Sequence, residues 1–155
     1  MIKNKMELTK KEILGVVVNN ELNLQEQTSK GNKDFVDMID KLNTSSIQVH
    51  IFHWQTKKKG SLAQHMAFGE YYEAIPSILD KMVETYQGKY GIITNFSCDG
   101  VVQYKGKEES INYFEDLVKM VEKKRKSIKE SWIQNQIDGV CELIYSTLYK
   151  LNNLE

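Results

Sequence analysis

The chain of 155 residues has little proline, little cysteine and no net charge, and each shortage excludes a class of protein. One proline and nine glycines favour long uninterrupted helices. The two cysteines, Cys98 and Cys141, form no C-x-x-C pair, which excludes a disulfide scaffold and a cysteine-ligated zinc site. Because 21 basic residues balance 21 acidic ones, the basic surface of a dedicated duplex binder is absent, and we expect weak or no DNA binding.

Long hydrophobic runs are also missing. The longest apolar run near the start of the chain covers residues 13–18, which is too short to span a bilayer. No small-residue cleavage site follows it, so the sequence does not predict a signal peptide. We therefore expect a single-domain protein of the cytoplasm with no membrane span.

Apolar residues at three- and four-residue steps predict four main helices, at about 33–56, 62–87, 110–128 and 131–151. Pro76 is expected to kink the second helix, with a break into two helices as the alternative, and Gly88 is expected to end it. Between the second and third helices, Asp99 and Gly100 indicate either a small β-hairpin or an extended crossover. Two short connections and one long one predict an all-α, ferritin-like four-helix bundle with a long crossover between helices 2 and 3. We expect the bundle to occupy residues 31–155, after an N-terminal extension of residues 1–30.

Histidine is rare and clustered. His50, His53 and His65 fall within sixteen residues, and Asp80 and Glu84 follow at helical i, i+4 spacing. Imidazole and carboxylate groups together are ligands for iron and zinc, although the same residues also occur as ordinary helix-surface or core residues. No histidine follows His65, which excludes a di-iron site inside the bundle built on Glu-x-x-His from two further helices.

The helical geometry of residues 62–87 indicates a site between two chains. His65, Glu73, Asp80 and Glu84 lie within an arc of about 100°, yet His65 and Asp80 are about 22 Å apart along the axis. They cannot share one metal ion within a chain. Two copies packed antiparallel about a two-fold axis would bring His65 of one near the acidic pair of the other, giving two identical sites per dimer. His53, across the short turn, would complete each site.

The arrangement of His53-Trp54, then His65 twelve residues after His53, then Asp80-x-x-x-Glu84 resembles the ferroxidase signature of Dps proteins, the miniature ferritins. Small Dps-like proteins encoded by phages look most similar. The resemblance implies a homo-oligomer, up to a hollow dodecamer, that binds Fe(II), oxidises it with hydrogen peroxide and stores the ferric product. It also implies that His53 and His65 come from one subunit, that Asp80 and Glu84 come from its two-fold partner, and that Trp54 lies beside the site.

One departure from that signature keeps a second hypothesis open. The family carries a carboxylate one helical turn after the second histidine, where this chain has Gly69. Glu73 and His50 are additional candidate ligands, although we expect His50 to be a surface residue or to support the ligands. A site with one carboxylate fewer could prefer zinc or another divalent metal. The alternative is a ferritin-like structural or interaction protein, phage-encoded, with a degenerate metal site.

Overall fold

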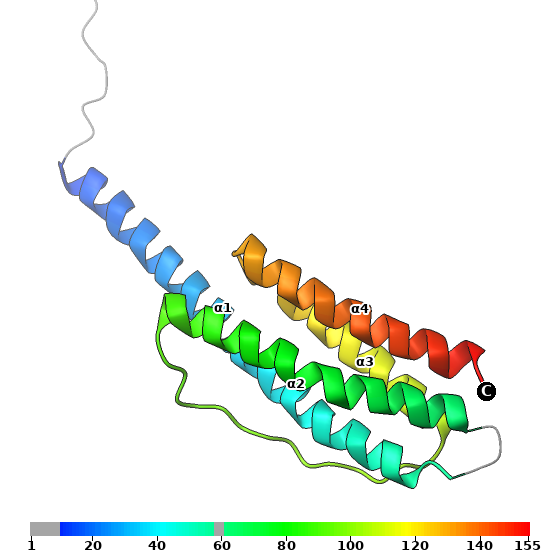
Figure 1. The fold of residues 1–155 in the computed structure, drawn as a ribbon. Helices are drawn as coiled ribbons and strands as arrows, with labels where there is room; N and C mark the ends of the chain where they lie inside the picture. Colours follow the sequence, from blue (N-terminus) through cyan, green and yellow to red (C-terminus); the bar gives the residue numbers. More distant parts are fainter. Residues whose placement is uncertain (1–9, 58–60) are drawn as a thin grey trace, which may run out of the picture.

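The computed structural model describes residues 10–57 and 61–155, with side chains described for residues 14–23, 32–57 and 61–155. Four helices make up this part of the chain: α1 (Lys10–Gln55), α2 (Leu62–Tyr90), α3 (Lys107–Arg125) and α4 (Ser131–Asn153) (Figure 1). Within these ranges no residue lies in a strand, so the expected all-α class is confirmed. No helix in them is both long enough and apolar enough to cross a membrane.

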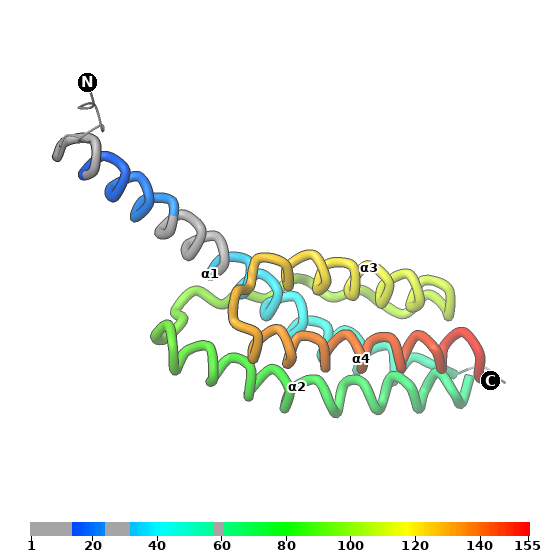
Figure 2. Tube along the Cα trace, turned by 90° about the horizontal axis from the view of Figure 1, so that it is seen from above, coloured from blue at the N-terminus to red at the C-terminus, as the bar shows by residue number. Residues whose placement is uncertain are grey.

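The four helices pack around one shared core, which we call the helical body. The C-terminal half of α1 packs against α2 and α3, and α4 packs against the same two helices (Figures 1 and 2). The helix expected at 131–151 is confirmed as α4, and it buries a stripe of apolar residues at three- and four-residue steps: Ile133, Ile137, Val140, Ile144, Leu148 and Leu151. Burial of these faces supplies the main driving force for folding.

The first helix is much longer than the sequence pattern predicts. α1 begins at Lys10 rather than near Lys33, and its N-terminal part extends beyond the helical body as a single helix (Figure 1). Residues 14–23 are all exposed. Among the described residues, no other helix packs against this part. The proposed domain boundary at residues 30 and 31 stays a prediction.

The second helix is continuous. α2 runs through Pro76 without interruption, so the alternative of two separate helices is wrong, and it passes Gly88 to end at Tyr90. Gly91 ends it instead, because its φ of 88° is a left-handed conformation that glycine adopts without strain. The Gly91 N–H donates to the Gln87 carbonyl oxygen at 2.8 Å, which satisfies one of the last carbonyls of the helix.

The segment between α2 and α3 is an extended crossover, and the alternative of a hairpin at Asp99 and Gly100 is wrong. Residues 91–106 contain neither helix nor strand. They run along the side of the helical body, from the end of α2 to the start of α3 at the opposite end (Figure 1). An extended backbone without a neighbouring strand must find other partners for its N–H and C=O groups.

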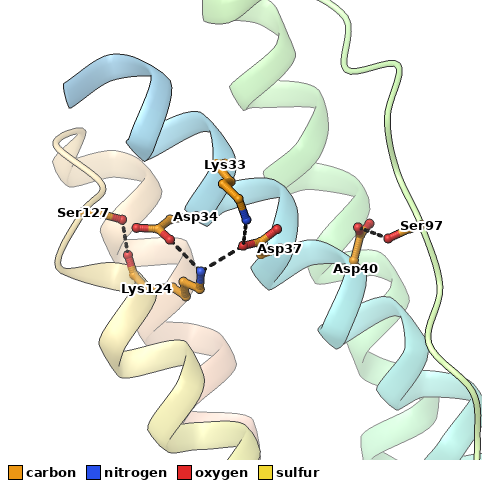
Figure 3. Close-up of polar contacts among 7 residues, drawn as sticks. All are labelled: Lys33, Asp34, Asp37, Asp40, Ser97, Lys124 and Ser127. Carbon is orange, nitrogen blue, oxygen red and sulfur yellow. Dashed lines mark hydrogen bonds and ion pairs between the residues drawn. The ribbon is translucent and has the colours of Figure 1, made fainter. Parts of the chain in front are cut away.

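Polar side chains of α1 supply those partners. Gln48, which is buried, donates from Nε2 to the Val102 carbonyl and accepts at Oε1 from the Val102 N–H, both at 2.7 Å. One turn earlier, Thr44 accepts a hydrogen bond from a crossover amide at 3.2 Å. One turn before that, the Ser97 hydroxyl donates to Asp40 at 2.6 Å (Figure 3). Four-residue spacing places these α1 residues in a row along the crossover.

An ion-pair cluster joins α1 to the C-terminal turn of α3. The Lys124 ammonium lies 2.6 Å from Asp34 and 3.1 Å from Asp37, and Lys33 lies 2.8 Å from Asp37 (Figure 3). Hydrogen bonds from Lys33 and Lys124 lower the pKa of Asp37 below its ordinary value. The cluster fixes the end of the helical body from which the N-terminal part of α1 extends.

Candidate metal half-site

His53 and His65 form a reciprocal pair at the other end of the helical body. His53 lies in the last turn of α1 and His65 in the first turns of α2, so the short connection between the helices brings them together. The Nδ1 atom of His53 lies 2.8 Å from the His65 carbonyl oxygen, and the Nδ1 atom of His65 lies 3.1 Å from the His53 carbonyl oxygen. Their rings stack with centroids 3.7 Å apart and planes 23° apart.

These two hydrogen bonds determine which ring nitrogens are free. A carbonyl oxygen can only accept, so each Nδ1 carries the proton and donates. In the neutral imidazole, the lone pair then resides on Nε2 of both His53 and His65. Metal-binding histidines commonly have one ring N–H donating to a backbone carbonyl, which orients the ring and fixes its tautomer. Each ring of the pair thus keeps one nitrogen, Nε2, that these two hydrogen bonds do not use.

Gly69 lies directly against this pair. A Cβ atom placed on Gly69 would lie 3.5 Å from Cε1 and 3.6 Å from Nδ1 of His53, which is ordinary van der Waals contact. Any side chain at position 69 would therefore start beside the His53 imidazole. Position 69 is where the Dps-like signature would carry its carboxylate, and a Cβ there meets no steric obstacle.

His50 belongs to an aromatic stack next to the pair. Its ring stacks on Tyr72 with centroids 3.9 Å apart and lies 4.1 Å from the exposed ring of Trp54. The centroid distance from His50 to His53 is 6.2 Å. The Tyr72 hydroxyl donates a long hydrogen bond, 3.4 Å, to Glu73. His50 thus has aromatic partners, and Trp54 lies beside the half-site.

Sequence reasoning did not identify Tyr72 as part of this cluster. Tyr72 follows His65 by seven residues, a spacing that places both on one face of α2. This spacing in the sequence could have indicated that Tyr72 lies near the histidine pair. Tyr72 contacts both His50 and His53, the latter edge-on with centroids 5.2 Å apart, and so links the stack to the histidine pair.

The acidic members of the predicted site lie elsewhere on the same chain. Asp80 and Glu84 are exposed on α2, about 22 Å and 28 Å along the axis from His65. Neither carboxylate has a hydrogen-bond or ion-pair partner in the described part of the chain. No group of three or more histidine, cysteine, aspartate or glutamate side chains there could hold a metal ion. One copy of the chain therefore brings together two of the four predicted ligands.

A family model matches residues 53–151, well over half of the chain. The chain belongs to DUF5856, a family of unknown function. The match to DUF5856 begins at His53 and includes His65, Asp80 and Glu84, whereas His50 precedes it. Comparison with curated proteins gives no match, and comparison with solved structures gives none either.

Proposed function

We propose that this DUF5856 protein is a Dps-like iron-binding protein that oxidises Fe(II) with hydrogen peroxide at sites between two copies of the chain. The ferric product would be stored within an oligomeric shell, and the helical body would be a ferritin-like four-helix bundle. The reciprocal pair of His53 and His65 is the observation that supports this proposal. Its hydrogen bonds leave two Nε2 lone pairs for a metal ion.

The ligand chemistry fits a divalent transition metal. Imidazole nitrogens suit Fe(II) and Zn(II), and carboxylates complete such sites with harder oxygen ligands. Because two nitrogens alone make a weak site, the proposal requires the acidic pair of a second copy. Asp80 and Glu84 are exposed and without partners in the described structure, so they are free to serve this role.

The spacing along α2 defines how two copies would meet. If the α2 helices pack antiparallel, a two-fold axis midway between His65 and the acidic pair crosses α2 near Glu73. His65 of one copy then lies opposite the region of Asp80 and Glu84 of the other. Glu73 lies at the axis, about 12 Å along α2 from His65, so it would serve the interface rather than the metal.

Exposed apolar side chains support an interface on this surface. Ile47 on α1 is 56% exposed, and Met66 on α2 is 54% exposed. Exposed apolar side chains beside polar ones occur at protein–protein contact surfaces. An isologous dimer that covers them would also assemble both sites at once.

The residues of the chain would bind and position Fe(II), which is the substrate. Each ferrous ion loses one electron and each peroxide molecule accepts two, so two ferrous ions are oxidised for each peroxide consumed. The two imidazoles and two carboxylates would hold Fe(II) at the interface. Neighbouring apolar groups of the interface would limit the access of water.

Measurement of Fe(II) oxidation by peroxide tests the proposal. We expect His65→Ala to reduce the rate to that of the protein-free control, because it removes one of the two nitrogen ligands. His50→Ala is the matched control: it removes a nearby histidine that has aromatic partners, and it should retain most of the wild-type rate. Equal rates for wild type and His65→Ala would contradict the proposal.

Gly69 favours a second candidate function, a structural or interaction protein with a degenerate metal site. Without a carboxylate at this position, the site has one anionic ligand fewer than the Dps-like signature. Purification in the presence of iron or zinc separates the two functions. An oligomer that retains no metal through gel filtration supports the second candidate, and stoichiometric metal supports the first.

A further inference from the structure

A cavity of about 690 Å³ lies at the same end of the helical body, between the end of α1, the start of α2 and the end of the crossover. Lys57, Lys105 and Lys107 line it together with Trp54 and several amide side chains. No carboxylate is among the described residues that line it. Its volume lies within the range of small-molecule binding sites, about 300–1,000 Å³.

The three lysines concentrate positive charge in a chain with no net charge. Lysines elsewhere in the described structure are often paired, as Lys124 is with two aspartates. No ion pair with a described carboxylate involves Lys57, Lys105 or Lys107. Unpaired cations that line a recess attract an anion more strongly than the same charges spread over a flat surface.

Hydrogen bonds fix one wall of this cavity. The Tyr104 N–H donates to Gln55 Oε1 at 2.7 Å, and the Tyr104 hydroxyl donates to Gln64 Oε1 at 2.7 Å. These bonds join the end of the crossover to both α1 and α2. The residue just before Lys105 is therefore held in place before any ligand binds, which lowers the entropic cost of binding.

We propose that this cavity binds a nucleotide, with its phosphates on Lys57, Lys105 and Lys107. Lysine ammonium groups are common phosphate ligands and act as point charges. The exposed ring of Trp54 at the cavity supplies a flat surface on which a nucleobase can stack. The proposal does not depend on metal binding, because neither His53 nor His65 lines the cavity.

Tryptophan fluorescence gives a direct readout. The chain has two tryptophans, so Trp132→Phe leaves Trp54 as the only reporter. The full-length protein is titrated in metal-free buffer with ATP, adenosine, inorganic phosphate and a short oligonucleotide, and calorimetry provides a second readout. We expect ATP to bind more tightly than adenosine, which lacks the phosphates, and more tightly than phosphate, which lacks the ring.

Replacement of the three cavity lysines by glutamine tests their role. The variant carrying Lys57→Gln, Lys105→Gln and Lys107→Gln should lose at least about tenfold in ATP affinity, because hydrogen bonds to charged groups contribute more than neutral ones. Circular dichroism and thermal melting show whether this variant remains folded.

A second triple variant controls for net charge. Lys119, Lys123 and Lys126 are exposed and lie toward the opposite end of α3, so their replacement by glutamine removes the same charge far from the cavity. This variant should bind ATP almost as wild type does. Equal losses in both triple variants would overturn the proposal.

Comparison of the four ligands gives the remaining tests of the proposal. Equal binding of ATP and adenosine, or of ATP and inorganic phosphate, would overturn the proposal, since one half of the nucleotide would then contribute nothing. Binding of the oligonucleotide that depends on the three lysines supports the proposal and indicates a nucleotide within a strand. If ATP binding depends on the three lysines and the oligonucleotide does not bind, the proposal is supported and the ligand is a free nucleotide.

Discussion

The substitution Gly69→Asp should convert the histidine pair into a stronger metal site. It restores a carboxylate one helical turn after His65 and beside the His53 ring. The nearest atoms to the new Cβ would lie 3.5 Å and 3.6 Å away, so the Cβ itself makes only ordinary van der Waals contact with the imidazole. Loss of a glycine from the interior of a helix is itself slightly favourable, by less than about 1 kcal/mol.

The contribution of the new carboxylate to the free energy of metal binding can be given a lower limit. A unit charge pair 4 Å apart is worth about 4 kcal/mol at an effective dielectric constant of 20, so a divalent ion gains about 8 kcal/mol from one carboxylate. Desolvation of the carboxylate removes several kcal/mol of this. A net gain of at least about 1.4 kcal/mol remains, which is a tenfold increase in affinity.

Anaerobic calorimetric titration with Zn(II) or Fe(II) measures this effect. We expect the dissociation constant of the Gly69→Asp protein to be at least about tenfold lower than that of wild type. Gly69→Asn is the matched control, because it fills the same space with a neutral amide. Equal affinities for the aspartate, asparagine and wild-type proteins would refute the assignment of this position to the metal site.

Two further predictions concern the fold that positions the site. Gln48→Leu removes both hydrogen bonds to Val102 and should lower the free energy of unfolding by about 1–3 kcal/mol in urea titrations, because two partly buried bonds are lost. Unchanged stability together with a still-protected Val102 amide in hydrogen exchange would contradict this. Asp37→Asn should be less stable than wild type at neutral pH, because the lowered pKa of Asp37 stabilises the fold only while the carboxylate is ionised. This difference in unfolding free energy should shrink as the pH falls below the ordinary value of 3.8, and a pH-independent difference would contradict the assignment.

Apolar periodicity predicted the packed helices well because burial imposes it. The stripe on α4 and the core positions of α2 follow directly from the sequence. The N-terminal part of α1 was not predicted in this way, and residues 14–23 are exposed, so no burial of a helix face marks it in the described structure. The end of α2 was misplaced by three residues, because either Gly88 or Gly91 could have ended the helix, and only the positive φ of Gly91 distinguishes them.

Three polar residues of α1 favour the extended crossover over the hairpin alternative. Asp40, Thr44 and Gln48 recur at four-residue steps on α1, and all three are buried. Buried polar side chains require hydrogen-bond partners, and a row of them on one helix face indicates an extended backbone alongside. β-propensity at residues 92–104 pointed to a hairpin instead, because an extended chain satisfied by side chains has the same local preference as a strand.

For the candidate site, spacing in the sequence predicted which side chains could lie close together, but it did not predict the hydrogen bonds that they make. The short connection after α1 made the approach of His53 and His65 predictable. Their exchange of hydrogen bonds with backbone carbonyls was not predictable, because it depends on the relative rotation of the two helices. The role of Asp80 and Glu84 depends on a second copy of the chain and stays a prediction.

Metal binding by mixed variants tests the central claim most directly. His65→Ala and Asp80→Ala each damage every site in their own homodimers. If a site takes its histidines from one copy and its carboxylates from the other, a mixed dimer regenerates one intact site of two. Unfolding and refolding the two variants together in equal amounts should therefore restore about a quarter of the wild-type metal content, because half of the dimers are mixed. No restoration, with the oligomeric mass unchanged, would contradict the account.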